Sequence, residues 1–148
     1  ILSVLTTGCK EKNENESTQP RPEVEASPQL VPEEQAVWKD EISLNEGTQW
    51  KANRETTEGI LKMTELVERS SASTPEDYRE LGNSLNIEKN LLLERCTMKE
   101  PSHENLHIYL QPLIEMIGEL QKVQTAEEGK QLVAKIKDHL ETYHSYFI

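Results

Sequence analysis

Soft sulfur and imidazole side chains are concentrated in one short stretch of this chain, residues 96–107. Cys96 and Met98 supply a thiol and a thioether, and His103 and His107 supply two imidazoles four residues apart. Thiolate, thioether and imidazole are ligands that suit copper and zinc. Two His residues at i and i+4 of a helix project from the same face, so both can reach one ion. The stretch therefore predicts a transition-metal site, and its two sulfur ligands favour Cu(I) over Zn.

The same side chains also have a purely structural interpretation. Cys96 can pack as a small buried hydrophobic residue, and Met98 can fill the end of a helical bundle. A His pair at the start of a helix is often exposed to solvent or hydrogen-bonded. His144, near the end of the chain, is a further candidate ligand or an outer partner of the metal ligands. The sequence therefore leaves two alternatives for these side chains, metal binding and packing in the core.

The composition of the chain excludes several functional classes. Of 148 residues, 16 are Lys or Arg and 27 are Asp or Glu, which gives a formal net charge of −11. Nucleic-acid binding needs clustered cations to neutralise phosphates, so we expect no nucleic-acid partner. The chain has no Gly-rich phosphate loop, no Ser nucleophile elbow and no Cys-x-x-Cys motif. We therefore expect a protein that is not an enzyme.

The first nine residues, ILSVLTTGC, form an apolar run that ends in Gly and Cys. This pattern resembles the signal of bacterial lipoproteins, in which a small residue and Gly or Ala precede a lipidated Cys. The resemblance implies that Cys9 carries a lipid and that the residues before it are removed. It also implies a protein anchored through this lipid in the bacterial outer membrane, on the periplasmic side or at the cell surface.

Residues 10–40 have the composition of a tether. They are rich in Glu, Asn, Ser and Gln, and four Pro residues are spaced through them. Such a segment buries too little apolar surface to offset the loss of chain entropy on folding. The sequence therefore predicts a disordered acidic linker over residues 10–40, between the lipid anchor at 1–9 and a folded domain at 41–148.

Apolar residues in the folded domain recur with helical spacing in four segments. The segments run from about residue 47 to 70, from 74 to 96, from 103 to 120 and from 125 to 147. Thr74 and Thr125 are expected N-caps because acidic residues follow each of them within the first helical turn. Short connections predict an all-α fold, an antiparallel up-down-up-down four-helix bundle. This topology places Cys96, the His pair and His144 at one end.

Two resemblances follow from particular residues. Tyr143-His144-Ser145-Tyr146 and Asn53-Arg54-Glu55-Thr56 resemble segments of the small periplasmic four-helix b-type cytochromes. That resemblance implies a four-helix fold with His144 as an axial haem ligand. However, Arg54 stands where the family has its Met ligand, and a guanidinium has no lone pair to give, so haem is not expected.

The second resemblance covers three short runs: Trp50-Lys51-Ala52-Asn53, Cys96-Thr97-Met98 and the final Tyr-x-x-Tyr-Phe. They resemble uncharacterised helical lipoproteins of Bacteroidota. We therefore predict a lipid-anchored cell-envelope protein that binds Cu or Zn and serves metal handling or sensing. A helical interaction or structural module without metal is the first alternative, and a b-type haem electron carrier is the second. No feature identifies a protein partner.

Overall fold

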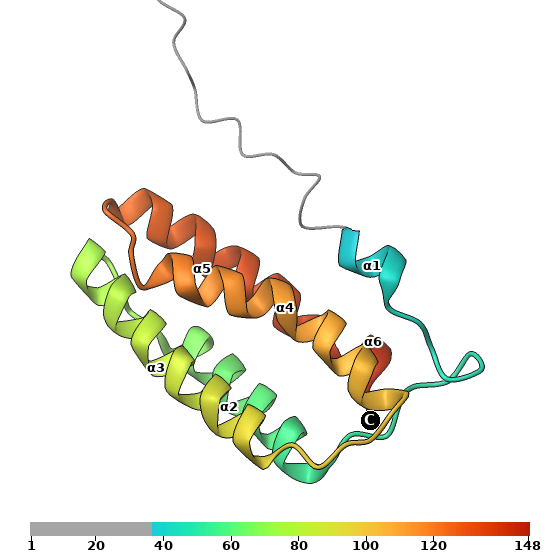
Figure 1. The fold of residues 1–148 in the computed structure, drawn as a ribbon. Coiled ribbons are helices and arrows are strands. Elements are labelled where there is room, and N and C mark those ends of the chain that lie inside the picture. The colour runs from blue at the N-terminus through green and yellow to red at the C-terminus, as the bar shows by residue number, and fades with distance from the viewer. Residues whose placement is uncertain (1–36) are drawn as a thin grey trace, which may run out of the picture. The chain divides into compact units, whose positions relative to one another are not determined.

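The computed structural model describes residues 37–148. Cys9 and most of the predicted linker lie outside the described residues. The described part is mostly helical and contains no strand, which confirms the all-α prediction (Figure 1). Its six helices are α1 (Val37–Glu41), α2 (Arg54–Arg69), α3 (Pro75–Arg95), α4 (Ser102–Leu120), α5 (Ala126–Glu141) and α6 (Tyr143–Tyr146).

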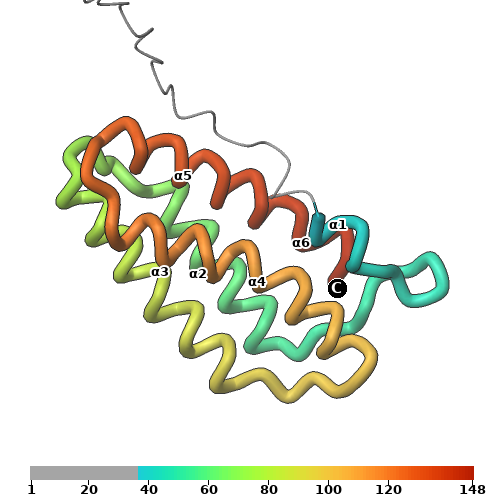
Figure 2. Tube along the Cα trace, turned by 45° about the horizontal axis from the view of Figure 1, so that its top comes forward, coloured from blue at the N-terminus to red at the C-terminus, as the bar shows by residue number. Residues whose placement is uncertain are grey.

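The four long helices, α2 to α5, pack side by side around one hydrophobic core (Figures 1 and 2). Each consecutive pair is in contact, and α2 also contacts α5, so the set closes on itself. The predicted apolar stripes of the first two helices are buried, as expected from their helical spacing. These buried residues include Ile60, Met63, Val67, Tyr78, Leu81, Leu85 and Leu92.

Local hydrogen bonds explain where α3 and α5 begin. The Thr74 hydroxyl accepts from the Asp77 backbone N–H, and the Asp77 carboxylate accepts from the Thr74 backbone N–H. Thr125 and Glu128 repeat this reciprocal pair at the start of α5. Each pair satisfies two backbone donors that the first helical turn would otherwise leave free. The predicted capping box at Thr125 and the predicted cap at Thr74 are both confirmed.

Close approach between α3 and α5 depends on a glycine. A Cβ placed on Gly129 would lie 2.3 Å from the Tyr78 ring and 2.8 Å from the Tyr78 Cβ. Both distances are far below van der Waals contact, and the Tyr78 Cβ is fixed to its backbone. The first turn of α5 can therefore lie this close to α3 only because residue 129 has no side chain.

The chain before α2 differs from the prediction. Residues 47–53, expected to begin the first long helix, are not helical, and α2 starts at Arg54. Asn45 and Thr48 exchange backbone hydrogen bonds across a tight turn in which Gly47 has a φ of +85°. That left-handed conformation suits glycine, which has no Cβ to clash with its own backbone.

The last predicted helix is shorter than expected, since α5 ends at Glu141 and the short helix α6 follows. The Thr142 hydroxyl donates to the His139 carbonyl at 2.6 Å and satisfies a carbonyl at the end of α5. Beyond α6, Phe147 is extended and pairs with Trp50 in an isolated parallel bridge. The prediction of one continuous helix to residue 147 was therefore wrong.

Helix α1 lies in a segment that the sequence assigned to the linker. Residues 37–40 are helical, and Trp38 is buried with 6% of its surface exposed. A single turn has no repeating apolar pattern, so its periodicity could not be recognised in the sequence. The predicted linker over residues 10–40 therefore extends too far at its end, and the folded unit includes residue 38.

Candidate metal centre at the start of α4

His103 and His107 face each other on the first two turns of α4. Their Nε2 atoms are 3.0 Å apart, and the two rings are nearly perpendicular with centroids separated by 4.4 Å. At this distance one Nε2–H donates to the lone pair of the other Nε2. The i, i+4 spacing thus brings two imidazole nitrogens to one point, as the sequence predicted.

Glu100 holds the far side of His103. Its Oε1 lies 3.2 Å from His103 Nδ1, and its Oε2 accepts from the Glu104 backbone N–H at 3.1 Å. A carboxylate accepts only, so His103 carries its proton on Nδ1, and its Nε2 lone pair accepts from His107 Nε2–H. In protein metal sites, a carboxylate behind a ligating His fixes the tautomer in this way and raises the basicity of the ligand. Glu100 was not among the predicted metal ligands, and it contacts His103 through Nδ1, the ring nitrogen that does not face His107.

The separation of the two nitrogens is close to the value that a metal ion requires. Zn–N bonds of 2.0–2.1 Å at a tetrahedral angle place two ligating nitrogens about 3.3 Å apart. The observed Nε2–Nε2 distance is 3.0 Å, a few tenths of an ångström below that separation. His107 is exposed and the side chain of His103 is 35% exposed, so solvent can reach the pair. The His pair is therefore accessible and already has the spacing of a two-imidazole site.

His107 is exposed, which differs from the prediction. His107 shares the helical spacing of Leu110 and Ile114, which predicts a core-facing side chain, but the structure buries Asn105 and Tyr109 and leaves His107 outside. Asn105 accepts from the backbone N–H and hydroxyl of Ser43, which explains why a polar side chain turns inward. The helix is rotated about its axis relative to the prediction, and this rotation exposes the His pair.

The two sulfur residues lie against the hydrophobic core. Cys96 is the C-cap of α3, and both Cys96 and Met98 are half-buried beside core residues. Cys96 lies near the Tyr143 hydroxyl, which is 3.0 Å from the Thr57 hydroxyl. Burial raises the pKa of Tyr143, the hydrogen bond with Thr57 lowers it, and the nearby Cys96 adds to the rise. Their surroundings match the packing interpretation.

His144 lies on α6 and is exposed. Its ring is 5.2 Å from the Tyr143 ring, and its backbone carbonyl accepts from Gln49 Nε2. Within residues 37–148, no group of three or more His, Cys, Asp or Glu side chains converges as a set of metal ligands. Of the five predicted ligands, the structure therefore pairs His103 with His107 and does not gather Cys96 or His144 with them.

The residues that resemble haem-binding segments have other roles. Arg54 is exposed and pairs with Glu58 at 2.6 Å. Met63, the nearest Met on the same helix, is fully buried in the core. Neither environment supports ligation of a haem iron between α2 and α6.

His139 was given no role by the sequence analysis, although it is the most buried His described. It belongs to α5 and faces Tyr109 of α4, with 7% of its surface exposed. The spacing from Ile136, three residues earlier, and to Tyr143, four residues later, placed it on the apolar stripe of its helix. That periodicity was the signal that could have identified it as a core residue.

Comparison of the chain with protein-family models, curated proteins and solved structures finds no match. No helix in residues 37–148 has the length and apolar content needed to cross a membrane.

Proposed function

We propose that this chain is a lipid-anchored protein of the bacterial cell envelope that binds a transition-metal ion through His103 and His107. Its role would be metal handling or sensing, without catalysis. The observation that carries the proposal is the 3.0 Å approach of the two Nε2 atoms, with Glu100 behind His103. An outer-membrane location and lipidation at Cys9 are supported by the resemblance of residues 1–9 to a lipoprotein signal.

We also propose that α2 to α5 form an up-down-up-down four-helix bundle. The contacts of each long helix with the next, and of α2 with α5, support this arrangement. Residues 70–74 and 121–125 are the connections at one end, and each is only five residues long. Connections this short favour antiparallel neighbours. The bundle would present the start of α4, and with it the His pair, at the other end.

Zinc is the first metal to test, although the sulfur residues first favoured Cu(I). Imidazole nitrogens suit Zn and Cu(II), whereas Cu(I) prefers soft sulfur. The half-burial of Cys96 and Met98 against the core therefore weakens the case for Cu(I). Two imidazoles leave the remaining positions around zinc to water, which is typical of an open site rather than a closed structural one.

The deciding experiment is a zinc titration of the 148-residue chain by calorimetry, repeated with copper. We expect one zinc ion per chain and loss of this binding in His107→Ala. Glu100→Gln should weaken binding by about 10-fold or more, because outer-shell carboxylates contribute on that order. His144→Ala is the matched control, since it removes an exposed His from another helix.

Binding that is equal in wild type and His107→Ala would refute the assignment of the His pair, and absence of binding by either metal would refute metal binding as a whole. If only copper binds and Cys96→Ser abolishes it, the original sulfur-based prediction is correct instead.

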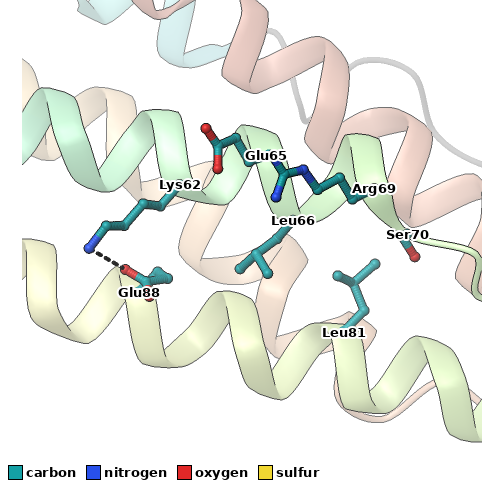
Figure 3. A pocket seen from close by; sticks show the side chains of 7 residues that line it. All are labelled: Lys62, Glu65, Leu66, Arg69, Ser70, Leu81 and Glu88. Carbon is teal, nitrogen blue, oxygen red and sulfur yellow. Dashed lines mark ion pairs between the residues drawn. The ribbon is translucent and has the colours of Figure 1, made fainter.

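A non-catalytic interaction module is the second candidate, and a groove between α2 and α3 favours it. The groove has a volume of about 320 Å³, and Leu66 and Leu81 point into the space between the two helices (Figure 3). Lys62 and Glu88 form an ion pair of 3.9 Å at one side, and Arg69 lies at the other (Figure 3). An apolar floor with charges of both signs suits a short segment of a partner protein. The metal titration separates the two functions.

A further inference from the structure

His139 is enclosed by aromatic rings from two other helices. The Trp38 ring of α1 lies 4.8 Å from the imidazole, and the Tyr109 ring of α4 lies 4.6 Å from it. Trp38 also contacts the rings of Tyr109 and Tyr146, at 5.7 and 5.6 Å. Trp38 therefore covers the place where α4, α5 and α6 meet, and His139 lies directly beneath it.

Two reciprocal hydrogen bonds join α4 and α5 at this point. The Tyr109 hydroxyl donates to the His139 carbonyl at 3.0 Å, and His139 Nε2 lies 2.9 Å from the Tyr109 carbonyl. A carbonyl only accepts, so Nε2 carries the proton and Nδ1 of the neutral ring is unprotonated. Adding a proton to Nδ1 would place a full positive charge between the Trp38 and Tyr109 rings. That charge is costly unless water reaches it.

The surroundings of His139 oppose its protonation on balance. Burial lowers its pKa below the usual value of 6.5, the bond to the Tyr109 carbonyl raises it, and Lys39 on α1 lowers it. From α4 the facing titratable group is the Tyr109 hydroxyl, which burial keeps neutral by raising its pKa. Within the described residues no carboxylate forms a hydrogen bond or an ion pair with His139, whose ring bonds to the Tyr109 carbonyl, so none compensates an added proton.

Helix α1 is the part of this enclosure that can move most easily. It has five residues, and Trp38 is its one buried side chain. A single helical turn has almost no stability of its own. The chain is fixed again at Ser43, whose backbone N–H and hydroxyl both donate to Asn105 Oδ1. Local opening can therefore release residues 37–42, which include the buried Ile42, and end at Ser43, while the long helices stay packed.

We propose that α1 is a proton-operated cover, which protonation of His139 lifts from α4, α5 and α6 in acid. Because the closed state lowers the pKa of His139, a proton binds the open state more tightly than the closed one. The closed state is therefore most stable above about pH 6.5 and loses stability relative to the open state as the pH falls. Opening hydrates His139 and uncovers the aromatic faces of Tyr109 and Tyr146. It also lengthens the connection between the helices and the preceding chain by residues 37–42. This inference does not depend on the proposed metal function.

The test is fluorescence of Trp38 in the full chain between pH 7.5 and 4.5. The chain has two Trp residues, so the Trp50→Phe variant makes Trp38 the only reporter. We expect Trp38 to become several-fold more accessible to acrylamide, with a midpoint below pH 6.5, while far-UV circular dichroism keeps the signal of the long helices. His139→Gln retains a donor for the Tyr109 carbonyl but cannot gain a proton, so its Trp38 should stay protected throughout.

His144→Gln is the matched control, because it removes an exposed titrating His and should leave the transition unchanged. If His139→Gln does not fold, His139→Phe offers an aromatic ring of similar size with no titrating group. A transition that persists in these His139 variants would overturn the proposal. So would a Trp38 that stays protected down to pH 4.5, or a loss of helical signal at the same midpoint.

Discussion

The two ends of the helical unit are built by different means. At one end, which we call the cap end, residues 70–74 and 121–125 connect the long helices through reciprocal caps that span three residues. At the other, the aromatic end, α1, α6 and residues 42–53 are joined by long-range contacts. Ser43 and Asn105 are 62 positions apart, and Thr57 and Tyr143 are 86 apart.

The helix starts at the cap end are fixed by local hydrogen bonds, whereas the aromatic end is fixed by contacts between segments distant in sequence. The reciprocal caps at the cap end are interactions that a short peptide could already make, and none of the predicted ligands lies there. Long-range contacts such as the 2.8 Å bond from Arg79 to the Val123 carbonyl then join the capped helices. The aromatic end forms only when α1, α6 and residues 42–53 have come together with the long helices. It also contains both His arrangements of interest, the exposed pair on α4 and the buried His139. Substitutions at the aromatic end should therefore have larger effects on stability or binding than those at the caps.

The largest loss of stability is expected from Phe147→Ala at the aromatic end. Phe147 is fully buried, stacks on Tyr143 at 5.2 Å and contacts the Tyr109 ring at 5.8 Å. Removing a buried Phe side chain costs about 3–5 kcal/mol of unfolding free energy. Urea unfolding followed by circular dichroism measures this. The neighbouring Ile148→Ala, at a residue 66% exposed, should change the free energy by less than about 0.5 kcal/mol. Similar values for both would contradict the described core.

The next effect concerns the cap end, where Gly129→Ala should destabilise the protein by about 1–3 kcal/mol through overpacking against Tyr78. Gly118→Ala is the matched control, because a Cβ at that position on α4 meets no atom within 4 Å. There the better helix propensity of Ala should stabilise the protein by up to about 1 kcal/mol. We expect the two substitutions to change the unfolding free energy measured in urea with opposite signs. A stabilising Gly129→Ala would disprove the close approach of α3 and α5.

Smaller effects are expected for the caps themselves. Thr74→Ala and Thr125→Ala should each cost about 1 kcal/mol, since each removes one acceptor for a first-turn N–H. The two sites share no partner, so the double variant should lose about the sum. Thermal and urea unfolding of the three variants measure this. A coupling of more than about 0.5 kcal/mol would show that the two caps are not independent local interactions.

The smallest effect on stability, and the largest on binding, is expected from His107→Ala. His107 is exposed, so its removal should change the unfolding free energy of the metal-free protein by about 0.5 kcal/mol or less. Zinc should raise the melting temperature of the wild-type protein, because it binds the folded state, but not that of the variant. A zinc-dependent rise that persists in His107→Ala would place the binding elsewhere.

Much of the helical arrangement could be predicted because its signals are local or periodic. The caps at Thr74 and Thr125 depend on residues three positions apart, and the buried stripe through Ile60 and Met63 repeats every three or four residues. The rotation of α4 was missed because its apolar residues occupy a wide arc, and contacts with other segments select which part is buried. Tyr109, which meets Trp38, His139 and Phe147, is buried in place of His107.

The sequence by itself determined that the part of the chain that the structure describes is helical, where α3 and α5 begin, and that two imidazoles share one face of α4. These features follow from backbone and side-chain geometry within a few residues. Only the tertiary structure decided that Cys96 and Met98 lie against the core, that His144 stays apart from the His pair, and that Trp38 covers His139. Those outcomes depend on which segments distant in sequence fill the same space, and no local pattern encodes that competition.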